Sequence, residues 1–270
     1  MTSNVEIETP PVVLSVAGLD PSGGAGVVAD VKTFTAFGCF AVAAVTSLTF
    51  QNTSGVYGAA HQSAEAVRAQ VLPVVEDFKV ACAKTGMLPT REIIEEVARL
   101  FRETSLPAPV VDTVVRSTSG HDLMDGAALD ALKRELLPLA RLVTPNIPEA
   151  EALTGLRVHD ERGMLEAARA LREMGARAVL VKGGHMGGDA LDLLDDGGEI
   201  KTFVAARVET VSTHGTGCAL SAGVAACLAR GMSLAESVGA AKRFVTDAIL
   251  RAPRLGRGQG PINHSVAARL

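Results

Sequence analysis

A continuous apolar run that includes β-branched residues, Val12 to Ala17, is the feature that most constrains the fold of this chain. Such a run is typical of a strand that is covered on both faces, as in a parallel sheet. A glycine-rich loop, Gly18 to Gly26, follows it. After this loop, apolar residues at i, i+4 and i+7 predict an amphipathic helix that ends near Gly38: Val27, Val31 and Phe34.

The same alternation of strand and helix recurs along the chain. Further buried strands are predicted at Phe40 to Leu48, Val110-Val111, Leu142-Val143 and Ala178 to Val181. Helical patterns lie at about 91–103, 125–138, 160–174 and 217–230. This order predicts an α/β fold with right-handed crossovers, in which helices cover both faces of a mostly parallel sheet. Because no long linker, repeat or low-complexity tract interrupts it, we expect one domain over residues 12–270 after a flexible N-terminal segment, residues 1–11.

Composition argues against several classes of protein. The net charge is −4 and the chain has no Trp, so neither phosphate attraction nor base stacking favours nucleic-acid binding. No apolar stretch is long enough to cross a bilayer. The acidic, polar start of the chain does not have the order of a secretory signal, and the four cysteines lack the spacing of a metal or redox motif. We therefore expect a cytoplasmic protein without a nucleic-acid or membrane partner.

Several loops follow predicted strands and are expected at one edge of the sheet. In open α/β sheets, ligands bind beyond the carboxyl ends of the strands. Gly18 to Gly26, Thr144 to Glu149 and Gly183 to Gly188 all occupy such positions. Their convergence predicts a binding site there.

Two common phosphate motifs match only in part. Gly18 and Gly23 have the glycine spacing of a P-loop, but Gly24-Ala25 stands where Lys-Ser/Thr is required. Gly24-x-Gly26-x-x-Ala29 resembles a dinucleotide fingerprint, yet no Asp or Glu lies between Val31 and Ala64 to hold a ribose. Both readings are disfavoured.

A second glycine turn, Gly215-Thr216-Gly217, opens directly into the helical run that begins at Cys218. Backbone N–H groups at such a helix start form a pocket for anionic oxygens. A cysteine there is expected to lose its proton more easily, because it lies at the positive end of the helix. The alternative is a tight turn in which Cys218 is an apolar core residue.

Seven motifs, in order, resemble bacterial hydroxymethylpyrimidine/phosphomethylpyrimidine kinases of thiamin synthesis, over roughly residues 12–264. They are Ala17-Gly18-Leu19-Asp20-Pro21-Ser22-Gly23-Gly24-Ala25-Gly26 with Asp30 and Lys32-Thr33-Phe34, Gln51-Asn52-Thr53, Lys84-Thr85-Gly86-Met87-Leu88, Thr144-Pro145-Asn146-Ile147-Pro148-Glu149-Ala150-Glu151, Val181-Lys182-Gly183-Gly184-His185, Thr213-His214-Gly215-Thr216-Gly217-Cys218 and Gly260-Pro261-Ile262-Asn263-His264. The resemblance implies a three-layer α/β/α ribokinase-like fold, usually dimeric. It also implies phosphorylation of a small hydroxymethyl compound with ATP and Mg²⁺.

The resemblance further implies roles for individual residues. Cys218 would accept the proton of the substrate hydroxyl, and the turn before it would form an anion hole for the phosphoryl group: Gly215, Thr216 and Gly217. The substrate would contact Gly18, Asp30, Gln51 and Met87. ATP would contact Lys182, Thr213 and His214, and Mg²⁺ would be organised by Asn146, Glu149 and Asp112.

Plainer readings exist for several of these residues. Asp30 fits a solvated helix face, Gln51 a polar strand end and Lys182 a strand-end lysine that reaches solvent. Asn146 and Glu149, three residues apart, also have the sequence of a helix capping box.

The predicted function is a kinase that forms 4-amino-5-hydroxymethyl-2-methylpyrimidine phosphate and then the diphosphate. Leu19 and the segment Val115 to Gly120 depart from the family pattern, which leaves the fine substrate preference open. The alternatives are a pyridoxal/pyridoxine kinase of the same fold and a non-catalytic protein that binds the pyrimidine.

Overall fold

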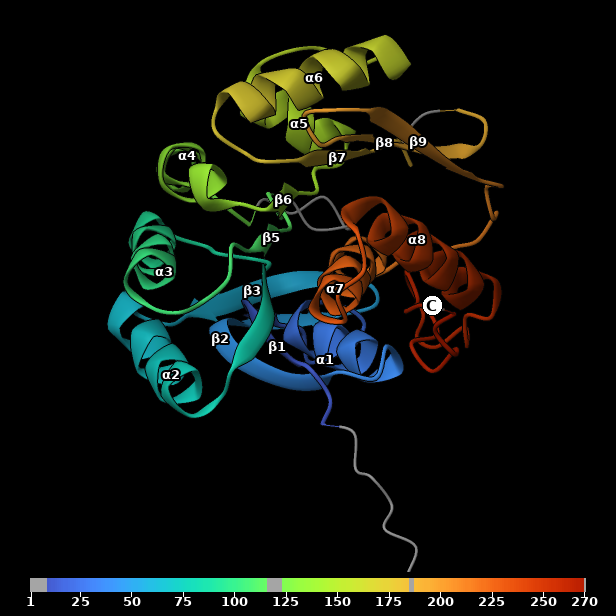
Figure 1. Cartoon of the computed structure of the whole chain (residues 1–270). Helices are drawn as coiled ribbons and strands as arrows, with labels where there is room; N and C mark the ends of the chain where they lie inside the picture. The colour runs from blue at the N-terminus through green and yellow to red at the C-terminus, as the bar shows by residue number, and fades with distance from the viewer. Residues whose placement is uncertain (1–8, 116–122, 185–186, 270) are drawn as a thin grey trace, which may run out of the picture.

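Helices cover both faces of one large sheet in the computed structural model, which describes residues 9–115, 123–184 and 187–269 (Figure 1). In these residues nine strands pair in the order β3-β2-β1-β4-β5-β6-β7-β8-β9. The six from β2 to β7 are parallel, and β3, β8 and β9 join them antiparallel at the two edges. The strands are β1 (Val12–Leu19), β2 (Phe40–Asn52), β3 (Gly55–His61), β4 (Val80–Thr85), β5 (Val110–Val111), β6 (Leu142–Val143), β7 (Val179–Lys182), β8 (Ala190–Asp195) and β9 (Ile200–Ala205).

Two groups of helices form the outer layers. One face carries α1 (Gly26–Ala36), α7 (Thr216–Ala229) and α8 (Leu234–Leu250). The other carries α2 (Ala64–Asp77), α3 (Arg91–Glu103), α4 (Gly126–Ala131), α5 (Ile147–Thr154) and α6 (Glu161–Glu173). This is the three-layer α/β/α arrangement that the resemblance predicted.

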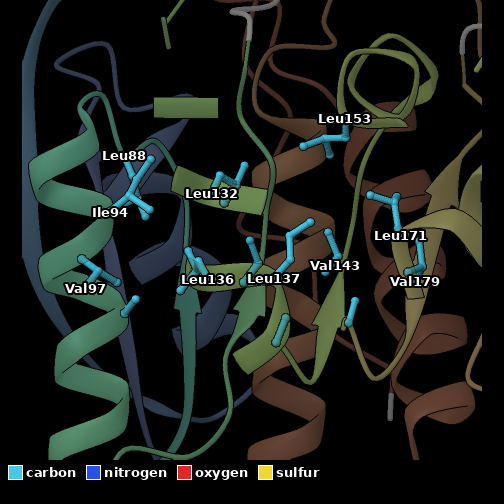
Figure 2. Packing of buried hydrophobic residues seen from close by; sticks show 14 of the residues in the cluster. Leu88, Ile94, Val97, Leu132, Leu136, Leu137, Val143, Leu153, Leu171 and Val179 are labelled. Carbon is cyan, nitrogen blue, oxygen red and sulfur yellow. The ribbon is translucent and has the colours of Figure 1, made fainter. Parts of the chain in front are cut away.

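The apolar run that opens the chain supplies both cores, because successive side chains of a strand point to opposite faces. Val13 packs into the cluster under α1 and α7, whereas Leu14 and Val16 pack into the cluster under the second helix layer. Figure 2 shows part of that second cluster, in which Leu88, Val143 and Leu171 come from different elements and are all buried. Burial on both faces is therefore the reason that β1 reads as a continuous apolar stretch.

The predicted elements are confirmed with small shifts. The helix predicted over 125–138 is α-helical only as α4, continues as a wider π-helical segment (Leu132–Leu136), and ends in a 3-10 turn (Leu137–Leu139) that contains Pro138. Strand Ala178 to Val181 is displaced by one residue to Val179–Lys182. The sequence patterns did not predict the edge strands β3, β8 and β9, the central strand β4, or the helices α2, α5 and α8. In β9, exposed and half-buried residues alternate, so it lacks the continuous buried run of the strands that were predicted.

Residues 1–8 and 116–122 lie outside the described residues. They include most of the predicted N-terminal segment 1–11 and the departure from the family pattern at Arg116 to Gly120. Within the described part of the chain, no helix combines the length and apolarity that crossing a bilayer would require.

Candidate active site

A cavity of about 1080 Å³ lies at the edge where the parallel strands end. Each of β1, β4, β5, β6 and β7 contributes its carboxyl end or the residues that follow it, as the topology requires. The predicted site residues that line it are Gly18, Gln51, Met87, Asp112, Asn146, Glu149, Lys182, Thr213, His214, Gly215, Thr216, Gly217 and Cys218. Asp30 is the predicted site residue that does not.

The glycine turn before α7 forms one wall of this cavity. Gly215 precedes the helix with a φ of 82°, and the helix begins without a side-chain cap. The Thr216 N–H donates to the Thr213 carbonyl oxygen at 3.3 Å, and no side chain caps the N–H groups that follow it in the first turn. A Cβ on Gly215 would overlap the carbonyl oxygen of Gly24. The turn and the first loop, residues 20–25, are therefore in direct backbone contact.

Cys218 does not have the acidity that its position predicts. Burial raises the pKa of its thiol to about 12, although the Lys84 ammonium and the Gly26 N–H both act to lower it. Asp112 and Asp30 add to the rise. The prediction of an easily ionised cysteine was wrong for the ligand-free protein, because removal of the thiolate from water outweighs the Lys84 ammonium and the Gly26 N–H.

Charged side chains of alternating sign form a row beneath and along the cavity. Lys84 Nζ lies 2.9 Å from Asp30 Oδ1, 2.8 Å from Asp30 Oδ2 and 4.0 Å from Asp112 Oδ2. Lys182 Nζ lies 3.1 Å from Asp112 Oδ1 and 4.0 Å from Glu149 Oε2. The row thus joins α1, β4, the end of β5, β7 and α5, and we call these five residues the charge row.

Burial and the charges of neighbouring members of the row together shift the pKa values of Asp112, Glu149 and Lys84. Burial alone would raise the pKa of Asp112, but Lys182 and Lys84 outweigh it and hold the pKa below its usual range. Burial raises the pKa of Glu149 to about 7, and the nearby Asp112 adds to the rise while Lys182 opposes it. Burial acts to lower the pKa of Lys84, yet the charges of Asp30 and Asp112 raise it overall.

Asp30 has a different place from the predicted one. Its side chain is fully buried, accepts a bond from Ser15 Oγ at 2.6 Å, and is paired with Lys84. It is not on a solvated helix face, and it lies outside the lining of the cavity. A carboxylate so close to Lys84 holds that ammonium in place, so Asp30 acts on the cavity through Lys84 and through its charge, which adds to the rise in the pKa of Cys218.

Asn146 and Glu149 form a capping box at the start of α5. Asn146 Oδ1 accepts from the Glu149 N–H at 2.9 Å, and Glu149 Oε2 accepts from the Asn146 N–H at 2.8 Å. Glu149 Oε2 also accepts from Thr113 Oγ1 at 3.2 Å. The capping interpretation is therefore confirmed, and both residues still line the cavity.

The oxygen-rich corner beside Lys182 suits a hard cation better than a soft one. Asp112 and Glu149 both lie near the same ammonium group, and the pKa of Glu149 is raised partly by the charge of Asp112. A cation would relieve that repulsion, and Mg²⁺ commonly uses one or two carboxylates together with phosphates and water. Among the described residues, no cluster of three or more His, Cys, Asp or Glu side chains has the arrangement of an all-protein metal site.

Asp20 also lines the cavity, although it is not among the predicted site residues. Its carboxylate is almost fully buried and accepts from the N–H groups of Ser22, Gly24 and Ala25, and from Ser22 Oγ, at 2.8–3.2 Å. It also contacts His214 Nε2 at 2.7 Å. Because an ionised carboxylate only accepts, Nε2 of His214 carries the proton and donates.

The charged cavity residues outside the predicted set include Lys84, Asp192 and Lys242. Lys242 Nζ lies 2.6 Å from Asp192 Oδ2, and Asp192 Oδ1 accepts from the Gly183 N–H at 3.1 Å. Lys84 belongs to the motif Lys84 to Leu88 and lies one residue before the end of β4. A charged residue in a buried strand could have indicated a functional site from the sequence alone. Asp192 and Lys242 come from separate elements, and no local pattern links them.

The comparisons with known proteins agree with this geometry. The family model for phosphomethylpyrimidine kinase matches residues 20–263. A hydroxymethylpyrimidine/phosphomethylpyrimidine kinase of Streptomyces coelicolor is 47% identical over 267 residues, which covers 99% of each chain. A crystal structure of phosphomethylpyrimidine kinase from Clostridium difficile 630 has a TM-score of 0.80 at 36% identity, over 88% of this chain and 99% of that one. An ADP complex of Bacillus subtilis pyridoxal kinase has a TM-score of 0.88 at 35% identity, over 95% and 98%.

The bonds to Asp20 predict a pH-dependent contribution to stability. Burial opposes its charge, but the bonds from His214 and Ser22 outweigh this effect and lower the pKa of Asp20 to about 2. A carboxyl group with a lowered pKa stabilises the fold above its unfolded pKa, and this contribution is lost as the pH falls through the folded pKa. A lowering of the Asp20 pKa from 3.8 to about 2 corresponds to about 2 kcal/mol. We therefore expect Asp20→Asn to lower the free energy of unfolding by about that amount at pH 7.

Urea unfolding of both proteins between pH 7 and pH 2 tests this expectation. The difference between wild type and Asp20→Asn should shrink towards zero as the pH falls from 5 to 2. A difference that stays constant over this range would show that the charge of Asp20 contributes no stability.

Proposed function

This chain belongs to the phosphomethylpyrimidine kinase family, and we propose that it transfers a phosphoryl group from ATP to 4-amino-5-hydroxymethyl-2-methylpyrimidine, and then to the monophosphate, in thiamin biosynthesis. The observation that carries the proposal is the combination of a family match over residues 20–263 with one cavity that holds both Gln51 and the turn before Cys218. We further propose that the protein is cytoplasmic.

The walls of the cavity are suited to the two ends of this reaction. Gln51 can donate and accept at once, which matches a ring nitrogen beside an exocyclic amine. Met87 packs close to Gly18, with Sδ 3.0 Å from where a Cβ on that glycine would lie, and offers an adaptable apolar surface for the ring. Across the cavity, the amides of Gly215 to Gly217 would stabilise the charge on the transferred phosphoryl group.

ATP is proposed to lie along β7 and the turn before α7. Lys182, with Thr213 and His214, would contact its phosphates, and the ADP bound by the Bacillus subtilis pyridoxal kinase supports a nucleotide in this fold. Asp112 and Glu149 would hold Mg²⁺ through oxygen or water, with Asn146 nearby. When bound, the ion would neutralise charge on the phosphate oxygens.

Transfer requires the substrate hydroxyl to lose its proton as its oxygen bonds to the γ-phosphorus and ADP leaves. We propose that Cys218, as thiolate, accepts this proton. Since burial keeps the free thiol protonated at neutral pH, the Lys84 ammonium and the amides of the turn must favour the thiolate when the substrates are bound. A loose transition state releases the proton late, so a strong base is not required.

A homodimer is the proposed assembly. The β2–β3 hairpin exposes large apolar side chains on its surface: Leu48, Phe50 and Tyr57. Exposed apolar groups that lie close together mark interaction surfaces in soluble proteins. The mass of the protein by light scattering tests this proposal, and a monomer at micromolar concentration would contradict it.

Phosphorylation of pyridoxal is the second candidate, favoured by the close structural match to the pyridoxal kinase. The test is ADP release with ATP and Mg²⁺ on hydroxymethylpyrimidine and on pyridoxal, with mass spectrometry of the products. Mono- and diphosphorylated pyrimidine at the higher kcat/KM are expected. A much higher kcat/KM for pyridoxal would overturn the proposed substrate, and pyrimidine binding without ADP release would indicate a non-catalytic protein.

Replacement of Cys218 separates catalysis from binding. Cys218→Ala should lower kcat by about 100-fold or more, with the KM for the pyrimidine within about threefold, because a general base contributes on that scale. Cys218→Asp, which supplies a carboxylate at the same point, should retain more activity than Cys218→Ala. Equal activity of Cys218→Ala and wild type would remove Cys218 from the reaction.

Replacement of Gln51 tests recognition of the pyrimidine edge. Gln51→Ala should raise the KM for the pyrimidine by about tenfold, since it removes a bidentate polar contact worth about 1–1.5 kcal/mol. The KM for ATP should stay within about twofold. Steady-state kinetics with each substrate varied in turn measures both constants, and an unchanged pyrimidine KM would place Gln51 outside the binding site.

A further inference from the structure

The tip of the β2–β3 hairpin is bonded to the irregular segment that follows α8. Thr53 Oγ1 accepts from the backbone N–H groups of Arg257 at 3.2 Å and Gly258 at 3.3 Å. The Thr53 carbonyl oxygen accepts from the Gln259 N–H at 2.8 Å. One residue thus receives three consecutive N–H groups from a segment about 200 positions away, and we call this contact the Thr53 latch.

Glycines in that segment allow the close approach. A Cβ on Gly256, where φ is 82°, would overlap Thr53 Oγ1, and a Cβ on Gly258 would overlap the Thr53 carbonyl oxygen. Gly258 therefore packs against the backbone of Thr53, and Gly256 packs against the Thr53 side chain. Such a fit is more specific than a pair of surface hydrogen bonds.

The latched segment leads directly to the anion-binding turn. The carbonyl oxygen of Gly260, next to Gln259, accepts from the His214 N–H at 3.2 Å, and His214 also pairs with Pro261 in an isolated parallel bridge. His214 immediately precedes Gly215, the residue that caps α7. The latch is therefore linked by one short stretch of backbone to the wall that faces the phosphates.

The two sides of the latch differ in how firmly they are held. Gln51, two residues before Thr53, belongs to a strand and is paired across the hairpin with Val56, so the sheet fixes it without the latch. Residues 252–259 form no helix or strand, and most of them are exposed. Loss of the latch should consequently loosen this segment and the turn, rather than Gln51.

We propose that Thr53 is a positioning residue. It holds Gly256 to Gln259 and, through Gly260, His214, and so fixes the position of the phosphate-binding turn relative to the substrate-binding hairpin. The expected effect of Thr53 on turnover rests on the proposed kinase function, whereas the contact itself does not depend on that function.

Thr53→Val tests the latch, because valine keeps the shape of threonine and removes the accepting hydroxyl. Thr53→Ser keeps that hydroxyl, and Ser54→Ala alters the exposed neighbour in the same turn as a control. The first measurement is limited trypsin digestion, since Arg254 and Arg257 lie in the latched segment and are exposed. We expect Thr53→Val to be cleaved at these sites about three- to tenfold faster than wild type, with Thr53→Ser and Ser54→Ala close to wild type.

The second measurement is steady-state kinetics with the hydroxymethylpyrimidine. Thr53→Val should lower kcat by about three- to tenfold, which corresponds to the loss of about one net hydrogen bond in the positioning of the turn. The KM for the pyrimidine should stay within about twofold, and Thr53→Ser should recover most of the activity. Both Gly256→Ala and Gly231→Ala place alanine at a positive φ, but only at Gly256 would the Cβ also meet Thr53, so only the former should reproduce the defect.

The outcomes separate the latch from the proposed function. Wild-type cleavage and wild-type kcat in Thr53→Val would overturn the latch. A raised KM with unchanged kcat would overturn it as well, because Thr53 would then act on Gln51. Faster cleavage in Thr53→Val, together with a wild-type protein that does not phosphorylate the pyrimidine, would support the contact and overturn the proposed function.

Discussion

The pairing of buried charges along the charge row is the constraint on which the rest of the site depends. Asp30, Lys84, Asp112, Lys182 and Glu149 come from five separate elements, and each is buried or nearly so. Removal of one member of such a pair leaves a buried charge without compensation, at a cost of about 3–5 kcal/mol. The row therefore ties α1, the central strands and α5 together in one arrangement. It also fixes the positions of the ionisable groups at the floor of the cavity before any ligand arrives, while the charge of Glu149 depends on pH because its pKa is about 7.

Above this floor, backbone contacts build the walls of the cavity. Gly215 packs on the carbonyl of Gly24, and Asp20 joins the first loop to His214. The capping box of Asn146 and Glu149 fixes the start of α5. Such an arrangement suits phosphoryl transfer, in which positioning and charge stabilisation do most of the catalytic work. The Thr53 latch extends the same principle, because it connects the wall that holds Gln51 to the wall that faces the phosphates.

The shared fold explains why phosphomethylpyrimidine and pyridoxal kinases both match this chain closely. In the proposed mechanism, the turn before Cys218 binds the phosphates and would be the same for either substrate. Selection between the two rings would then fall on other side chains that line the cavity, such as Gln51 and Met87. The family match identifies the chemistry, and these side chains are where the proposed substrate preference resides.

The amino-acid sequence by itself determined the layer order, the parallel sheet and the edge at which the site lies, since these follow from local periodicity and from glycine turns after buried strands. All but one of the site residues that the sequence motifs implied line the cavity in the structure, and Asp30 is the exception. The sequence could not predict that Asp30 lies behind the cavity wall, paired with Lys84, or that Cys218 has a raised pKa. Those properties depend on burial and on charges that residues distant in sequence bring together, and only the tertiary structure decides them.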